Sequence, residues 1–472
     1  FVRRNVRHWR SLENSGLAEA ASDSEPEAEL LQREELRRLR QEVLYLSRLR
    51  RKITVMYYYD GKKSREIAEL LSIPAATVRW HLAEARNSMK ERMEMTETKL
   101  YQPQKLLVGH CGNVHSPVYQ DLQNDMLTQN ICLACREKAL GMEELARTLG
   151  VAAVYLEYKM ERLVDMDYMR KVGGNKYRTG FYIWDDDFQI KTERFRYERA
   201  IPLGLPLYQL LKDHLPEIRR IEGIPAAGDN FLLWALLPGL ISGVFDRVQA
   251  DIQKEAGAEG NPPKRSDGSA HWLIARTRFR DRIGSQKELP EDFRDYCAHG
   301  DVRGVKTREA GRLRSLQYDL MCFHGWRDFE SWDLLQLEQV CALLSEKHTP
   351  GGAEKEVIAG LAEKGYVTVE DGQPYIQIPF IKGTALKETI CRWLPEYLDL
   401  ETVRQVYLEY GHLVDGLLPG DIARSERAFL QTDFAPEGAI MYALYQKGYL
   451  QEPAAEERKR LCTLVWEESN GS

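Results

Sequence analysis

The stretch DGKKSREIAELLSIPAATVRWHLAEARNSMKERM, residues 60–93, combines a regular apolar pattern with a high density of charge. Its apolar positions recur every three or four residues, which is the spacing of one face of an α-helix. These positions are Ile67, Leu71, Val78, Leu82, Ala85 and Met89. The pattern predicts two helices, each with one narrow apolar stripe.

A break between the two helices is marked by Pro74, because the residue before a proline disfavours helical dihedral angles. Ser64 is placed to cap the first helix, and Glu66 lies in its first turn, where a carboxylate complements the helix dipole. The second helix is expected to span Ala75–Arg92. Two short helices joined by a tight link have the spacing of a helix-turn-helix, the alternative being a helical hairpin within a larger core.

An excess of positive charge favours the helix-turn-helix over a buried hairpin. Residues 48–92 contain eleven Lys and Arg and five Asp and Glu, a net charge of +6. Because the whole chain carries −6, the remaining residues together carry −12. A basic segment in an acidic protein indicates binding to phosphate groups, and therefore to nucleic acid.

These residues also resemble a known family. Residues 45–93 are similar to region 4 of bacterial RNA polymerase sigma-70 family factors, particularly the extracytoplasmic-function group, and we expect the region to span 35–95. The matching positions are Tyr58, Gly61, Ser64, Glu66, Ile67, Ala68, Leu71, Ile73, Pro74, Thr77, Val78, Leu82, Ala85 and Arg86. Ser64 lies one residue further from Gly61 than in many members, and Ser72 replaces the commoner glycine.

The resemblance implies a unit that reads the upstream (−35) promoter element and docks on the flap of the polymerase β subunit. In such a unit the second helix enters the major groove of DNA. Its outward positions, which we expect to read bases, are Arg79, Trp80, Ala83 and Glu84. An arginine can donate two hydrogen bonds to guanine, and a glutamate can accept one from cytosine.

A second set of residues is placed to contact phosphates, which positions a protein without specifying sequence. This set is Lys62, Lys63, Arg65, Thr77 and Arg86. Many members of the family carry a basic residue in place of Glu84 and a small one in place of Trp80. These two departures put in doubt the promoter sequence that the resemblance would imply.

The first residues resemble the end of sigma region 2, which melts the downstream promoter element. FVRRNVRHWRSLENS, which begins at Phe1, is basic and aromatic, and the fitting residues are Arg3, Arg4, Asn5, Arg7, His8, Trp9 and Arg10. We expect residues 1–17 to be the remnant of a truncated region 2; the alternative is a basic helix of no special partner. Residues 18–29 are acidic and small, which predicts a flexible linker over residues 18–34.

The chain continues far beyond a minimal sigma factor, as a long C-terminal extension. Its composition predicts a mainly α protein of several domains. The expected segments are a linker at 96–120, a winged-helix domain at 121–186, a mainly helical α+β domain at 187–330, a second winged-helix-like unit at 331–382 and a C-terminal helical segment at 383–472. Within 187–330, HWLIARTRF (271–279) is the expected strand.

The winged-helix domain is expected from three apolar-patterned helices followed by two strands about Gly173-Gly174-Asn175. Its third helix has few cations, and its basic cluster, on the wing, is Lys171, Lys176 and Arg178. The weaker copy at 331–382 ends in an acidic hairpin. We therefore favour protein contact or a structural role for these domains over DNA contact.

Enzyme motifs are missing from the sequence. It has no Gly-rich phosphate loop, no H-E-x-x-H and no G-x-S-x-G, and Asp185–Asp187 is expected to be a solvated loop after the wing. The apolar run FLLWALLPGLISGVF (231–245) is shorter than a membrane span, which predicts a buried helical hairpin. Eight cysteines without paired spacing suit a reducing cytoplasm. We expect a cytoplasmic protein with no enzymatic activity, no cofactor and no membrane partner.

The expected function is that of a sigma-like transcription initiation factor. Its partners would be double-stranded promoter DNA, the RNA polymerase core and an anti-sigma factor or signal protein, with the extension serving regulation or protein interaction. One alternative is a helix-turn-helix transcriptional regulator that acts without polymerase. The other is a signal-sensing or protein-interaction module whose DNA-binding unit is vestigial.

Two groups of cysteine and histidine residues have the composition of zinc sites. One comprises His110, Cys111, His115, Cys132 and Cys135, and the other Cys297, His299, Cys322 and His324. Cys132 and Cys135 fall within an apolar helical run, where cysteine behaves as a small buried hydrophobe, whereas structural zinc sites usually present C-x-x-C on a turn. We expect no metal at either group.

Purified protein should therefore contain well under one zinc ion per chain by elemental analysis. Chelation should leave its melting temperature unchanged, because no fold energy depends on a metal. A stoichiometric metal whose removal unfolds residues 110–135 would show instead that Cys132 and Cys135 are ligands.

Overall fold

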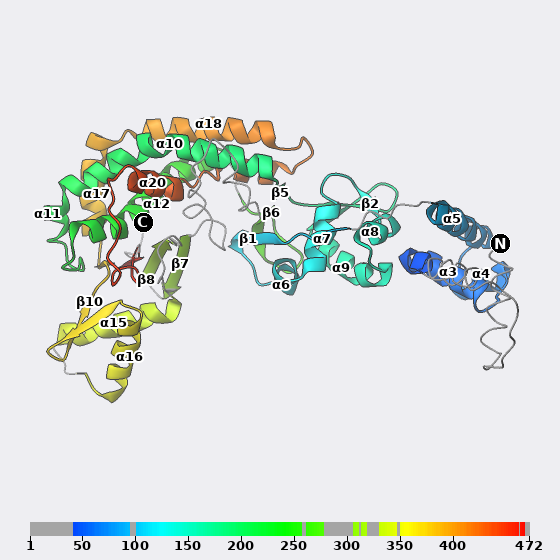
Figure 1. Ribbon diagram of the computed structural model, residues 1–472, viewed down its shortest axis with the longest axis horizontal. Helices are drawn as coiled ribbons and strands as arrows, with labels where there is room; N and C mark the ends of the chain where they lie inside the picture. Colours follow the sequence, from blue (N-terminus) through cyan, green and yellow to red (C-terminus); the bar gives the residue numbers. More distant parts are fainter. Residues whose placement is uncertain are drawn as a thin grey trace, which may run out of the picture. The chain divides into compact units, whose positions relative to one another are not determined.

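The computed structural model describes residues 41–94, 101–256, 261–277, 305–310, 313–318, 330–346, 350–461 and 463–467 (Figure 1). They form two compact units. The first comprises the described residues up to Lys105, Val114–Tyr182 and Lys264–Ser269, and the second comprises Leu106–Asn113, Ile183–Pro263 and the described residues from Ala270. The fold is mainly α, as expected. The expected region 2 remnant at 1–17 and linker at 18–34 lie outside the described residues.

The first unit begins with the helix-turn-helix, coloured blue in Figure 1. Its helices are α3 (Arg48–Tyr58), α4 (Ser64–Leu71) and α5 (Ala75–Glu94), so both expected helices are confirmed. The apolar stripes of α4 and α5 meet α3 in one core that contains Ile53, Tyr58, Ile67, Val78 and Leu82. Ala85 and Met89 continue the stripe of α5 against Leu46.

The ends of α4 differ in part from expectation. Ser64 is its first helical residue rather than its cap; Lys63 takes the cap position, and its backbone N–H donates to the Glu66 carboxylate at 2.5 Å. The helix ends at Ser72, which has the left-handed φ of 53° that glycine adopts more easily. The glycine of the family therefore has a conformational role here that serine fills at some cost.

After α6 (Pro117–Asn124), three helices and a small sheet follow in the first unit. They are α7 (Met126–Ala134), α8 (Met142–Leu149), α9 (Ala153–Asp165), β2 (Leu140–Gly141), β3 (Met169–Val172) and β4 (Lys176–Thr179), with the strands in the order β2-β4-β3. The hairpin between β3 and β4 turns at Gly174 and Asn175, both with positive φ. This is the element order of a winged helix.

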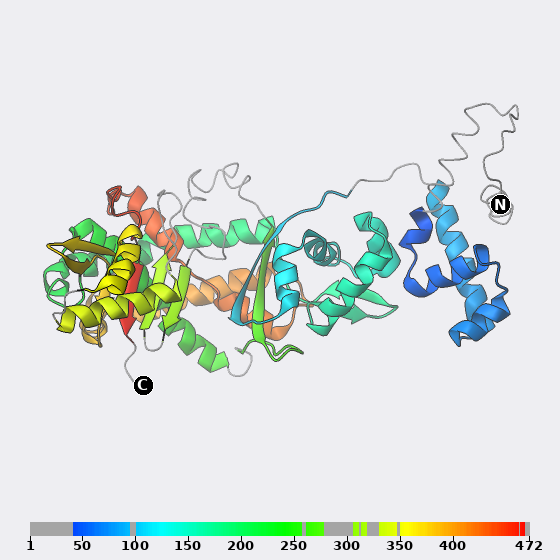
Figure 2. The same ribbon diagram turned by 90° about the horizontal axis from the view of Figure 1, so that it is seen from below.

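The expected linker at 96–120 contains regular structure instead. Strand β1 (Leu106–Asn113) pairs antiparallel with β6 (Ala270–Thr277), and α6 (Pro117–Asn124) starts at a Ser116 cap. Figure 2 shows β1 and β6 as two long strands side by side. The partner strand lies more than 150 residues away in sequence, so local pattern could not reveal the pairing.

Long helices form most of the second unit. α10 (Asp186–Asp213) packs against α12 (Asp229–Ala256), α18 (Leu400–Leu417) and α20 (Glu437–Gln446) (Figure 1). At the crossing with α20, a Cβ on Gly204 would lie 2.3 Å from the Ile440 side chain, so glycine permits the close approach. The shorter helices are α11 (Leu215–Ile218), α17 (Ala385–Tyr397) and α19 (Arg424–Thr432).

The two larger sheets of this unit have three and four strands. β6 pairs with β1 on one side and with β5 (Ile183–Trp184) on the other, so HWLIARTRF does contain the expected strand. The other sheet has the order β11-β12-β8-β7, from Phe380–Ile381, Thr463–Glu467, Leu313–Tyr318 and Val305–Ala310. β12 therefore lies within the segment 383–472, for which only helices were expected.

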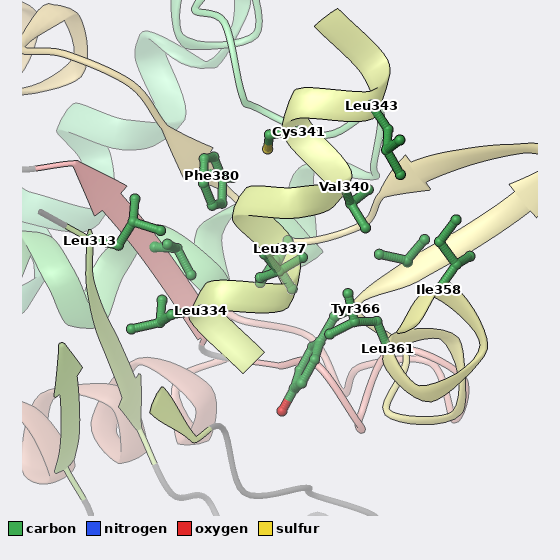
Figure 3. Close-up of a cluster of buried hydrophobic side chains, with 13 residues drawn as sticks. Leu313, Leu334, Leu337, Val340, Cys341, Leu343, Ile358, Leu361, Tyr366 and Phe380 are labelled. Atoms are coloured by element: carbon green, nitrogen blue, oxygen red, sulfur yellow. The ribbon is translucent and has the colours of Figure 1, made fainter. Parts of the chain in front are cut away.

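The segment expected as a second winged helix contains α15 (Ser331–Glu346), α16 (Gly352–Glu363), β9 (Val367–Glu370) and β10 (Gln373–Ile376). The hydrophobic core of this segment also contains side chains from other parts of the chain. Figure 3 shows Leu334 and Leu337 projecting from α15, with Phe380 beside the helix, and the same buried cluster includes Leu313 of β8 and Val465 of β12. Side chains far outside residues 331–382 thus complete this core.

Two further expectations are wrong in detail. Residues 231–245 lie in the single helix α12, which has Pro238 inside it, and do not form a hairpin. Within the described residues, α12 is the one helix with the length and hydropathy of a membrane span, and 78% of its apolar window is buried. Asp185–Asp187 is the start of α10, where Asp185 accepts from the Phe188 N–H, rather than a solvated loop.

A buried arginine joins the helices of the second unit. Arg196 of α10 donates to the Tyr410 hydroxyl at 2.8 Å and to the backbone carbonyls of Asp433 and Phe434. It also pairs with Glu193 at 2.8 Å. Since buried polar groups are costly when unpaired, this one side chain satisfies α18 and the segment between α19 and α20 together.

Replacing this arginine should destabilise the second unit. In Arg196→Leu, the Tyr410 hydroxyl and two carbonyls lose their donor, so we expect the free energy of unfolding to fall by about 3 kcal/mol. Urea unfolding followed by near-ultraviolet circular dichroism measures the change. The control is Arg199→Leu, which removes an exposed pair with Glu409 and should cost no more than about 0.5 kcal/mol. Equal losses of unfolding free energy in the two variants would contradict the role of Arg196 in joining the helices.

Candidate nucleic-acid interface

The outward face of α5 is available because its apolar stripe is turned toward α3 and α4. Val78 and Leu82 are buried, whereas Arg79 on the adjacent position is exposed. Ala83 and Glu84, one turn further, are half-buried. The structure thus brings the four expected base-reading residues to the surface of one helix, and Arg79, the one cation of the four, is exposed.

Trp80 is the fourth of these residues, and its ring has neighbours. It is 53% exposed, lies edge-on to the His81 ring at 4.8 Å, and has the Arg50 guanidinium 5.7 Å from its centroid. A cation at this distance from an indole face is attracted by the ring electrons. Arg50, on α3, was not among the expected site residues because the contact joins two helices.

The expected phosphate-binding residues lie around α4 and α5. Lys63, Arg65 and Arg86 are exposed, and Lys62 and Thr77 are half-buried. Among the ion pairs of the described residues, none involves Lys62, Lys63, Arg65, Arg79 or Arg86; Arg86 donates from Nε to the Leu82 carbonyl at 3.2 Å. These charges are therefore not neutralised by a described carboxylate.

Other cations of the segment are already paired within the first unit. Arg50 donates to Glu143 of α8 at 2.6 Å, and Arg51 lies 3.4 Å from Glu157 of α9. The charge excess in the sequence therefore divides into cations that face solvent and cations that face the winged helix. The sequence could not show which cations are paired, because the carboxylates that pair with Arg50 and Arg51 lie about 100 residues away along the chain.

A cleft of about 640 Å³ lies beside the paired cations. Trp80, His81 and Arg50 line it from the helix-turn-helix. The facing wall is acidic; its carboxylates are Glu143, Glu144, Glu157, Glu161 and Asp165. Burial in this position lowers the pKa of His81, the nearby Arg50 lowers it further, and Glu143 acts in the opposite direction.

The winged helix itself presents a mixed surface. On its third helix, α9, Tyr155 and Tyr158 are 67% and 64% exposed. On the wing, Lys171 and Lys176 are exposed, and Lys176 lies 3.5 Å from Glu144. Aromatic side chains with few free cations are more typical of protein contact than of a phosphate backbone.

Cysteines in the first unit are buried. Cys132 and Cys135 have no exposed surface; burial raises the pKa of the Cys132 thiol well above its usual range and that of Cys135 to about 12. Among the described residues, no three His, Cys, Asp or Glu side chains are grouped as metal ligands would be. Cys297, His299, Cys322 and His324 lie outside these residues, as do the expected region 2 residues Arg3, Arg4, Arg7, Trp9 and Arg10.

Comparison with known protein families gives one match. The family described as Sigma-70, region 4 matches residues 36–89, which cover α3, α4 and most of α5. No curated protein and no solved structure matches the chain at a significant level. The match supports the similarity of this segment to sigma-70 region 4 and, with it, a DNA-binding role of the sigma-like kind.

The contacts of His81 lead to a prediction about its titration. The pKa of His81 should lie below 6.5 in the folded protein, because burial and Arg50 both disfavour its charged form. Its imidazole C–H signals in selectively labelled protein, followed by NMR against pH, give this value. In Arg50→Ala the pKa should rise toward 6.5.

The lowered pKa of His81 also makes the free energy of unfolding depend on pH. Between the folded and unfolded pKa values the unfolded chain binds more protons, so stability from His81 is lost as pH falls below 6.5. The denatured protein provides the control for the unshifted value. A folded pKa at or above 6.5 would contradict the placement of His81 beside Arg50.

Proposed function

We propose that this chain is a sigma-like transcription initiation factor of the extracytoplasmic-function type. Its helix-turn-helix would bind the −35 promoter element and dock on the β flap of RNA polymerase, while the C-terminal extension serves regulation or protein interaction. The region 4 match supports this proposal. We further propose that the protein is cytoplasmic, acts without enzymatic activity or cofactor, and has an anti-sigma factor or signal protein as a further partner.

The observation that carries the proposal is the group of unneutralised cations around α4 and α5. Lys63 and Arg65 begin the first helix, and Arg79 lies on the exposed flank of the second. A recognition helix enters the major groove with its N-terminal turns, while the first helix crosses the DNA backbone. The positions of these cations fit that geometry, with Arg79 toward bases and Lys63 toward phosphate.

A sigma-like factor and a regulator that acts alone differ in one requirement. A sigma-like factor contacts core polymerase and directs it to a promoter, whereas the regulator binds DNA without it. Two experiments separate the sigma-like factor from the regulator. Co-purification tests whether the protein binds core RNA polymerase, and transcription in vitro tests whether it directs the polymerase to a promoter. Stable promoter binding with no polymerase association would favour the regulator.

Substitution of Arg79 and of Lys63 should impair DNA binding in different ways. Arg79→Ala should remove roughly 1–3 kcal/mol of discrimination at one base pair, because its guanidinium is placed to read a base edge. Lys63→Ala should weaken binding to all sequences alike and reduce the salt slope of the binding constant by about one. Fluorescence anisotropy with a selected promoter duplex and its single-base variants measures both.

Stability provides the control for these two variants. Both side chains are exposed and outside the apolar stripe, so neither change should lower the free energy of unfolding by more than about 0.5 kcal/mol. Identical losses from both variants on every sequence would leave only a nonspecific basic patch. The proposal that α5 reads promoter bases would then be wrong.

A further inference from the structure

The N-terminus of α8 in the winged helix holds the start of α3 in the helix-turn-helix. Glu143 accepts three hydrogen bonds there: from the Ser47 backbone N–H at 3.0 Å, from the Ser47 hydroxyl at 2.9 Å and from Arg50 at 2.6 Å. Charge-assisted bonds of this kind are stronger than neutral ones. One carboxylate therefore satisfies both the cap and the first turn of α3.

A second group of contacts joins the same two parts of the first unit. Arg147, at the other end of α8, donates to the Ser88 hydroxyl of α5 at 2.7 Å and to Glu42 at 3.3 Å. Three ion pairs join the two parts, and their side chains are only 12–18% exposed. They are Arg50–Glu143, Arg51–Glu157 and Arg147–Glu42. They form a network of partly desolvated charges, which is worth more than isolated surface pairs.

The contacts also limit what can approach Trp80. Trp80 and His81 line a cleft of about 640 Å³, and the winged helix supplies its facing wall. DNA phosphates entering it would meet the carboxylates of Glu157, Glu161 and Asp165. Arg50 is meanwhile occupied by Glu143 and unavailable to phosphate.

We propose that the acidic face of the winged helix, made by α8 and α9, is a docking surface for the chain's own helix-turn-helix, and that docking competes with DNA. The inference rests on the proposed function, because it assumes that the helix-turn-helix binds DNA. Only in the undocked fraction of the protein is Trp80 released from the cleft, and Arg50 from Glu143, for contact with a duplex. The apparent dissociation constant for DNA is therefore raised by the inverse of that fraction.

The test uses variants that break docking without adding positive charge. Arg147→Gln removes a cation, and Ser88→Ala removes its acceptor on α5 without changing the charge. If docking competes with DNA, both variants should bind duplex DNA more tightly than the wild-type full chain, by about fivefold or more. Simple loss of a cation predicts the opposite for Arg147→Gln, namely weaker binding. Fluorescence anisotropy at fixed salt measures the affinities.

Arg162→Gln is the matched control. Arg162 also lies in the last turn of a winged-helix element, α9, but it pairs with Asp121 and not with the helix-turn-helix. Its substitution should leave DNA affinity unchanged or slightly weaker. Tighter binding by Arg162→Gln, equal to that of Arg147→Gln, would overturn the inference.

Hydrogen exchange at Ser47 reads docking independently of DNA affinity. Its N–H precedes α3 and donates to Glu143, so exchange should be slow in the docked protein and faster in Arg147→Gln, in Ser88→Ala and in wild-type protein with excess duplex. Unchanged exchange at Ser47 in all three would overturn the docking surface even if DNA binds. Normal docking signals with no DNA binding by any variant would instead overturn the proposed function and, with it, the competition.

Discussion

The narrow apolar stripe shared by α4 and α5 is the constraint on which the candidate interface depends. Ile67, Val78 and Leu82 occupy one side of their helices and are buried against Ile53 and Tyr58 of α3. A helix with 3.6 residues per turn that buries so thin a stripe must direct its remaining side chains outward. The cations of both helices consequently reach the surface, and their exposure follows from the packing of the core.

The winged helix then divides those surface charges into two functional classes. The side chains of Lys63, Arg65 and Arg79 take part in no ion pair among the described residues, whereas Arg50 and Arg51 face Glu143 and Glu157. A paired cation attracts phosphate less than a free cation does, because the opposite charge of the adjacent carboxylate cancels most of its field. The net charge of +6 therefore overstates what DNA would encounter while these pairs persist.

The second unit depends on contacts between segments that are distant in the sequence. Arg196 satisfies groups near residues 410 and 433, and Gly204 allows Ile440 to approach α10. The core around α15 is completed by Leu313 and Val465. These long-range contacts explain why segments that read as separate domains share one compact unit, since no local pattern encodes where a distant partner will pack.

The sequence by itself determined the helices of the region 4 unit, the mainly α class and the type of residue offered to DNA, because helical periodicity and charge are local properties. It also indicated the strand at 271–277 and the hairpin that turns at Gly174 and Asn175. Only the tertiary structure decided that β1 replaces a linker, that Asp185 caps α10, and that Arg50 lies over the Trp80 ring while it pairs with Glu143. Each of these outcomes depends on which distant groups meet, and that is settled by packing and by pairing of buried polar groups rather than by residue order.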